Sequence, residues 1–169
     1  MKNYFYFLCT LILIHLVACS EDDNTGTTVQ SIQIKNLAAD PTTGYDTLTG
    51  APIGDTKLFT FFRLSDSTVV NHSDSASSKW DLGFRSSRII VNSGTSGPGH
   101  AGAFIYNGLF DDLKEVPADS SFKSDNSPVY AIGSSWSTYN GASMTINATP
   151  GKVLVIQTAD GKYAKMEIL

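Results

Sequence analysis

The chain has few charged side chains and no surplus of basic ones. Only 17% of its 169 residues are Asp, Glu, Lys or Arg, and the formal net charge is −4. A nucleic-acid partner is therefore excluded, because binding to phosphates needs a concentrated excess of Lys and Arg. Since 41% of the residues are hydrophobic, the chain is neither a disordered acidic tail nor a protein with several membrane spans. Its length is enough for one domain with a substantial core.

Cysteine is equally scarce, and both cysteines lie near the N-terminus in a segment with the features of a secretory signal. Lys2 precedes an apolar run, from Tyr4 to Val17, that is too short for a membrane span. Leu16-Val17-Ala18-Cys19 resembles a bacterial lipobox, in which small residues precede a lipid-modified cysteine. We therefore expect residues 1–18 to be a signal peptide and Cys19 to carry the lipid anchor. An ordinary signal peptide with a chance cysteine is the alternative.

Such processing would leave no cysteine in the mature chain, because Cys9 would leave with the signal peptide and Cys19 would carry the lipid. Disulfides, thiolate metal sites and a cysteine nucleophile would then be excluded. Ser20-Glu21-Asp22-Asp23 resembles the export signal of surface lipoproteins in Bacteroidetes-type bacteria, with a solvated acidic linker as the alternative. We expect residues 19–29 to tether the protein to the outer membrane, at the cell surface.

Residues 30–169 contain almost no helical periodicity and many segments in which apolar and polar side chains alternate. This pattern predicts one all-β domain, an antiparallel sandwich-like fold with at most one short helix, at residues 109–116. The chain ends inside a predicted strand, so we expect either that this strand closes a sheet or that the chain has been cut short. The predicted strands span residues 29–35, 57–64, 68–70, 80–85, 88–92, 103–106, 143–148, 153–158 and 163–169.

Two features of these strands can be tested directly. Turn dipeptides at Pro150-Gly151 and Asp160-Gly161 predict that the last three strands form a meander. Alternation within residues 80–85 predicts that Trp80, Leu82 and Phe84 lie on one face of their strand.

No motif of a known enzyme class is present. Residues 97–102 match the letters G-x-G-x-x-G, but a strand rather than a helix is predicted after them, which favours a wide glycine loop over a dinucleotide site. The sequence has no G-x-S-x-G elbow and no H-E-x-x-H pair. The adjacent Asp111 and Asp112 cannot flank one scissile bond, and they suit the start of the short helix. We therefore expect a protein without catalytic activity.

Soft and imidazole side chains are so few that any transition-metal centre must draw on four residues. Beyond Cys19 these are His72, His100, Met144 and Met166. We expect His72 to be an exposed loop residue and Met166 to be core filler. His100 is either a solvent-facing residue of the glycine loop or a ligand contact. Met144 follows the loop Asn140-Gly141-Ala142 at the mouth of a strand, where it can be core or ligand.

Several sequence blocks resemble the HmuY-like haem-binding lipoproteins of Bacteroidetes. They are Trp80 to Arg85 (WDLGFR), Arg88 to Gly97 (RIIVNSGTSG), Gly99 with Gly102-Ala103, and Ala159 to Met166 (ADGKYAKM). Together with the lipobox and the aromatic strand near Phe59, the resemblance covers most of residues 30–169.

The resemblance implies a surface lipoprotein that captures haem, expected as haem b, and passes it to a TonB-dependent transporter of the outer membrane. Family members hold the iron between two axial side chains, His and His or Met and Met, in loops ahead of the late hairpin. The second of these loops, residues 136–150, contains Met144, which is our candidate iron ligand. His100 is our second candidate contact with the cofactor. The haem propionates would need a cation, for which Arg85, Arg88 or Lys152 is available.

The chain also departs from the family pattern. Residues 116–136, where the first ligand loop is expected, contain neither His nor Met, so the second axial ligand is open. The alternative function is a binding or adhesion module that recognises a glycan or a protein on the same β scaffold. Trp136, Tyr139 and Tyr130 would then stack on sugar rings, although core packing is the more ordinary role for Trp136.

Overall fold

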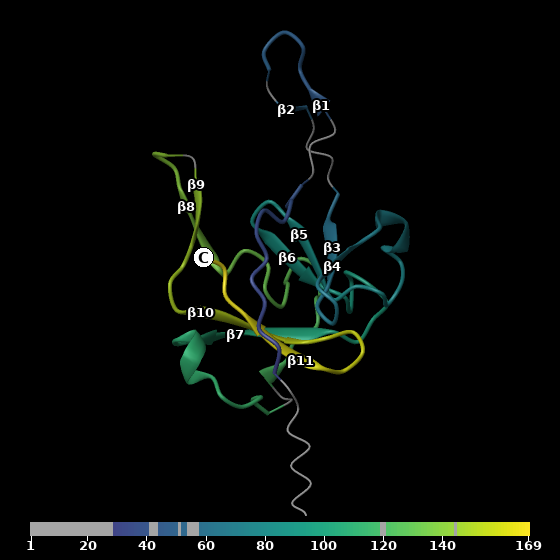
Figure 1. Cartoon of the computed structure of the whole chain (residues 1–169), viewed down its shortest axis with the longest axis vertical. Coiled ribbons are helices and arrows are strands. Elements are labelled where there is room, and N and C mark those ends of the chain that lie inside the picture. The colour runs from purple at the N-terminus through teal and green to yellow at the C-terminus, as the bar shows by residue number, and fades with distance from the viewer. Residues whose placement is uncertain (1–28, 41–43, 51, 54–57, 119–120, 144) are drawn as a thin grey trace, which may run out of the picture. The chain divides into compact units, whose positions relative to one another are not determined.

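The computed structural model describes residues 29–169 apart from 41–43, 51, 54–57, 119–120 and 144 (Figure 1). It divides into two units, Met1–Gln33 and Ile34–Leu169. Contrary to the strand predicted for residues 29–35, the described part of this segment is irregular and exposed. Its apolar side chains alternate only loosely, and Val29 and Ile32 are 88% and 67% exposed. Among the described residues, no helix has the length and apolar character needed to span a bilayer.

The second unit consists of short strands, as predicted, joined by turns and loops. The predicted helix at residues 109–116 is reduced to a single 3-10 turn, η2 (Phe110–Asp112), and the chain is extended again at Leu113. Another 3-10 turn, η1 (His72–Asp74), follows β4. The strands are β1 (Gly44–Tyr45), β2 (Pro52–Ile53), β3 (Thr60–Arg63), β4 (Thr68–Val70), β5 (Leu82–Arg85), β6 (Arg88–Val91), β7 (Gly102–Asn107), β8 (Ser137–Asn140), β9 (Thr145–Ala148), β10 (Lys152–Gln157) and β11 (Tyr163–Met166).

All strand pairs are antiparallel, and they form two larger sheets and two hairpin ladders. The larger sheets have the strand orders β4-β3-β5-β6 and β11-β10-β7, while β1 pairs with β2 and β8 with β9. The predicted meander is therefore half correct. Strand β10 does pair with β11, but its other neighbour is β7, and β9 turns back onto β8 instead. The turn at Pro150-Gly151 separates two sheets rather than joining two paired strands.

One apolar core lies between the two larger sheets. In the first sheet, Phe62, Leu82 and Val91 stand opposite one another on neighbouring strands and face this core. In the second sheet, Leu154 and Ile156 of the central strand β10 also face this core, and both are fully buried. The shared core confirms the prediction of an all-β, sandwich-like domain.

The first sheet is also covered on its other face, where a second cluster contains Phe61, Trp80 and Ile90. The prediction that Trp80 shares a face with Leu82 is therefore wrong. Trp80 precedes the first residue of β5, and its ring lies against Phe61 with centroids 4.5 Å apart. Gly83 leaves room for this layer, since a Cβ there would lie 2.8 Å from the Ile90 side chain.

The outer face of the second sheet is covered by the segment that follows β7. Phe122 packs edge-on against Phe104 of β7, with ring centroids 5.2 Å apart, and also contacts Tyr163 of β11. The ammonium group of Lys165 lies 4.1 Å from the centroid of the Phe110 ring and donates a hydrogen bond to the Phe110 carbonyl. Strand β10 therefore has fully buried side chains on both faces, which explains its nearly continuous apolar sequence.

Buried polar side chains fasten the wide glycine loop between β6 and β7. The Asn92 amide group donates to the carbonyls of Ser77 and Trp80, while its oxygen accepts from the Gly99 amide. The carboxylate of Asp125 accepts from the main-chain amides of Val91 and Ala131. This loop leads directly into a strand, as predicted, and so lacks the helix that a dinucleotide site requires.

Candidate ligand-binding site

The leading candidate ligand, Met144, lies outside the described residues, in the connection between β8 and β9. Its neighbours Ser143 and Thr145 are both exposed, and the β8–β9 hairpin projects away from the two larger sheets (Figure 1). His100 lies in the glycine loop and is also exposed. His100 is therefore accessible, but it does not line either of the two pockets described below.

The described part of the hairpin has one apolar face and one polar face. Tyr139 stands opposite Ile146 in the ladder, and these side chains are 67% and 41% exposed. Ala148, two residues after Ile146, is on the same face. Threonine and asparagine side chains occupy the other face. An exposed strand face of this kind offers a flat apolar surface to a ligand.

The other imidazole and thioether side chains behave as the sequence predicts. His72 is exposed in η1, with its ring centroid 5.6 Å from that of Phe61. Met166 is half-buried and packs against the main core. Within the described part of the chain, no three His, Cys, Asp or Glu side chains come together in a group that could hold a metal ion.

The three aromatic residues that could stack on a sugar are in different environments. Trp136 packs against the main core, and its indole N–H donates to the Ser87 carbonyl over 2.8 Å. Tyr130 is half-buried beside the second cluster. Tyr139 alone of the three is exposed, so the set does not form one stacking platform.

A pocket of about 330 Å³ lies at the turn between β5 and β6. It contains two of the three cations expected to be available for a carboxylate ligand, Arg85 and Arg88. The third, Lys152, instead donates a hydrogen bond to the Asn107 side chain on β7. The lining residues are Asp40, Arg85, Ser86, Ser87, Arg88 and Ser134.

The local backbone explains how the two arginines meet. Strands β5 and β6 are joined by Ser86 and Ser87 alone, so Arg85 and Arg88 stand directly opposite each other. Ser86 has a φ of +51°, in the left-handed region that tight hairpin connections require. This site is partly visible in the sequence, because one predicted strand ends at Arg85 and the next begins at Arg88, with only two residues between them.

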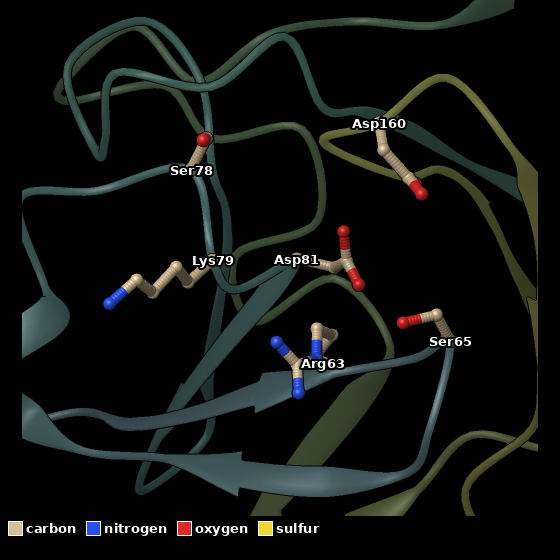
Figure 2. A pocket seen from close by; sticks show the side chains of 6 residues that line it. All are labelled: Arg63, Ser65, Ser78, Lys79, Asp81 and Asp160. Carbon is tan, nitrogen blue, oxygen red and sulfur yellow. The ribbon is translucent and has the colours of Figure 1, made fainter.

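A second, smaller pocket of about 140 Å³ is lined by charged side chains from three separate segments (Figure 2). Arg63 ends β3, Lys79 and Asp81 precede β5, and Asp160 follows β10. Asp81 is buried, and its carboxylate accepts from the Leu64 and Ala159 amides, both over 2.8 Å. Asp81 therefore fastens the ends of the two larger sheets together.

The exposed charges around this smaller pocket are paired as well. Arg63 forms an ion pair with Asp66, Lys79 with Asp74, and Asp160 with Lys162. A hydrogen bond from the Thr158 hydroxyl, followed by one from Lys162, lowers the pKa of Asp160. We interpret this pocket as a structural junction, because its charged groups already have protein partners.

Neither pocket has the apolar lining needed to bury a porphyrin. Small-molecule sites enclose about 300–1,000 Å³ and are mostly apolar, whereas these pockets are polar and the larger measures about 330 Å³. The donor chemistry nevertheless fits haem in two respects. The hairpin offers an apolar face, and the arginine pair offers partners for carboxylates.

Comparisons with known proteins agree with the blocks found in the sequence. The family model described as HmuY protein matches residues 55–169, well over half of the chain. A search of curated proteins returns no match. The matched range includes both larger sheets, the β8–β9 hairpin and, apart from Asp40, the residues that line the pocket at the β5–β6 turn.

Proposed function

Because the chain belongs to the HmuY family, we propose that it binds haem b on the apolar face of the β8–β9 hairpin, without catalysis. The family match is the observation that carries this proposal, since the family is one of haem-binding-type proteins. The exposed pair Tyr139 and Ile146 supports the location, because a flat apolar ring gains free energy by covering such a surface.

Met144 is the residue that we propose would hold the haem iron, through its thioether. It is the one thioether on this hairpin, and its exposed neighbours would give a planar ligand access to it. His100 is the second proposed contact with the cofactor, since its imidazole is exposed in the glycine loop. Haem held in this open way could be handed on, and we propose a TonB-dependent transporter of the outer membrane as the recipient.

Titration of the purified protein with hemin tests this function. We expect a saturable shift of the Soret band with a defined stoichiometry, lost or strongly weakened in Met144→Ala. Met166→Leu is the matched control, because it changes the half-buried methionine that packs on the core and should leave the spectrum unchanged. His100→Ala should change the band only if the imidazole contacts the cofactor.

The absence of any saturable shift, in both oxidised and reduced samples, would contradict haem binding. It would favour the alternative of a binding module for a glycan or a protein, for which exposed Tyr139 is the available aromatic contact.

We also propose that the protein is an outer-membrane lipoprotein anchored through Cys19 at the cell surface. The lipobox-like sequence and the polar segment after it support this proposal. Cys19→Ser should move the protein from the membrane fraction to the soluble fraction after cell lysis. Retention of the variant in the membrane fraction would overturn the anchor.

A further inference from the structure

The chain contains the tripeptide Tyr-Asn-Gly twice, at residues 106–108 and 139–141. In each copy the asparagine is exposed and is the last residue of its strand, β7 or β8. A glycine after an asparagine lets the main-chain nitrogen approach the side-chain carboxamide, because no Cβ stands in the way. The two copies have the same local sequence, so any difference in their reactivity comes from the fold.

In the first copy, both groups that would react are engaged. The Gly108 amide donates a hydrogen bond to the Gly151 carbonyl over 3.0 Å. Asn107 stands opposite Lys152 in the ladder, and its side-chain oxygen accepts from the Lys152 ammonium group over 2.6 Å. The carboxamide is therefore drawn across to β10. A Cβ at Gly108 would lie 2.5 Å from the Tyr106 ring, so the backbone here has little room to rotate.

In the second copy, the same groups are oriented differently. The side-chain oxygen of Asn140 accepts from the Ala142 amide over 3.0 Å and from the Ser143 amide over 3.3 Å. The Gly141 amide donates no hydrogen bond within the part of the chain that the structure describes. A Cβ at Gly141 would have its nearest neighbour 3.9 Å away, on the Tyr139 ring. The Asn140 carboxamide is thus turned toward the main chain that follows it, and the Gly141 backbone has room to rotate.

We propose that Asn140 is a site of spontaneous deamidation, and that the fold protects Asn107 from the same reaction. The Gly141 nitrogen loses its proton to hydroxide and forms a bond to the Asn140 Cγ. The bond from Cγ to Nδ2 breaks, and the amino group leaves as ammonia with a proton taken from water. A second water molecule then opens the resulting succinimide ring at either carbonyl, which gives aspartate or isoaspartate. The reaction consumes one water, releases one ammonia and needs no oxidant.

Both products change the β8–β9 hairpin. Each adds a negative charge to a chain whose formal net charge is already −4. Isoaspartate also lengthens the main chain by one carbon at the residue that pairs with Thr145, so it disturbs the last pair of the ladder. In the described part of the chain this hairpin shares no strand with either larger sheet, so the change stays local.

Incubation of the purified protein at mildly alkaline pH, followed by peptide mapping with mass spectrometry, tests this site. We expect Asn140 to be converted about tenfold faster than Asn107, because the reaction of Asn107 must first break the hydrogen bonds that hold both of its reacting groups. In concentrated urea the two rates should become similar, since the two tripeptides are identical and the fold is lost.

Gly141→Ala supplies a variant that changes the reaction without disturbing the fold. The added methyl group has open space around it, but it stands next to the attacking nitrogen and should slow conversion of Asn140 by about tenfold or more. Conversion of Asn107 should stay unchanged in this variant.

Equal rates at the two asparagines of the folded protein, or a faster rate at Asn107, would overturn the proposal. An Asn140 that stays intact while the urea-unfolded chain is converted would also overturn it, as would a Gly141→Ala variant that reacts as fast as the unchanged protein. None of these measurements depends on haem, so the outcome is independent of the proposed function.

Discussion

At the scale of single residues, carboxylates of this protein have two different roles. The carboxylates of Asp81 and Asp125 are buried and accept hydrogen bonds from main-chain amides of segments distant in sequence. These bonds take the place of ladder hydrogen bonds at the strand ends. Asp66 is exposed and interacts with its neighbours Arg63 and Thr68. The two buried carboxylates therefore stabilise the fold, whereas the exposed carboxylate of Asp66 makes a local, pH-dependent contact.

The pKa of Asp66 can be tested by titration. The hydrogen bond from Arg63, followed by that from Thr68, lowers this pKa from 3.8 to about 2. The contact therefore stabilises the folded state fully above pH 3.8 and is lost as the pH falls through about 2. NMR titration of the Asp66 carboxyl carbon should show this midpoint, and Arg63→Gln should raise it towards 3.8. An unchanged midpoint in Arg63→Gln would contradict the assigned cause.

At the scale of elements, the glycine loop between β6 and β7 is a fixed structure rather than a loose connection. Gly94 has a φ of +57°, and a Cβ at this position would lie 1.9 Å from the Asp125 carbonyl oxygen. Gly161, in the turn between β10 and β11, has a φ of +83° and open space around it. Both glycines have a left-handed backbone, but only Gly94 also has a close neighbour. Comparing them therefore distinguishes the cost of backbone strain from the cost of a steric clash.

Replacing each of these glycines with alanine should have unequal effects. Gly161→Ala should cost about 1–2 kcal/mol from left-handed backbone strain alone. Gly94→Ala should cost roughly 1–3 kcal/mol more, because the new methyl group must displace the Asp125 backbone. Chemical denaturation measures both free energies of unfolding. Equal losses of unfolding free energy in the two variants would show that the loop accommodates the methyl group at position 94 at no additional cost in stability.

Most strands could be predicted from the sequence because their side chains alternate, but β1, β2 and β8 lie in no predicted segment. The residues of β3, β4, β5, β6, β9 and β11 all fall within predicted segments, whereas β10 begins at Lys152, one residue before its predicted segment. Alternation does not say which strand is adjacent, so the pairing of β10 with β7 was missed. The pairing of β9 with β8 was missed because β8 itself was not predicted. The position of Trp80 was also missed, since alternation holds only inside a strand and this residue lies before β5.

The residues of the candidate site could be predicted from the sequence, but their arrangement in space could not. Residue type alone identified Met144, His100 and the arginines as chemically suitable. The convergence of Arg85 and Arg88 on one pocket depends on the β5–β6 register, which a sequence indicates only through the two-residue connection.

At the scale of the whole molecule, one core connects the two larger sheets, so we expect them to unfold together. Leu154 is fully buried on the central strand β10 and belongs to the cluster that contains Phe62 and Leu82 of the other sheet. Leu154→Ala should therefore destabilise the whole domain by about 2–5 kcal/mol. Leu109→Ala, at a side chain 66% exposed, should change stability by less than about 0.5 kcal/mol.

Thermal unfolding followed by near-ultraviolet and far-ultraviolet circular dichroism measures this coupling. The two signals should change at one temperature in both variants, with the lower temperature for Leu154→Ala. Separate transitions for the two signals would show that unfolding is not two-state and would contradict the expected coupling.

The β8–β9 hairpin forms its own ladder and shares no strand with either larger sheet in the described part of the chain. Its length and sequence can therefore be exchanged without shifting the register of any other strand. The scaffold accordingly offers an insertion point, where a grafted peptide loop could be displayed on a framework that folds without its help.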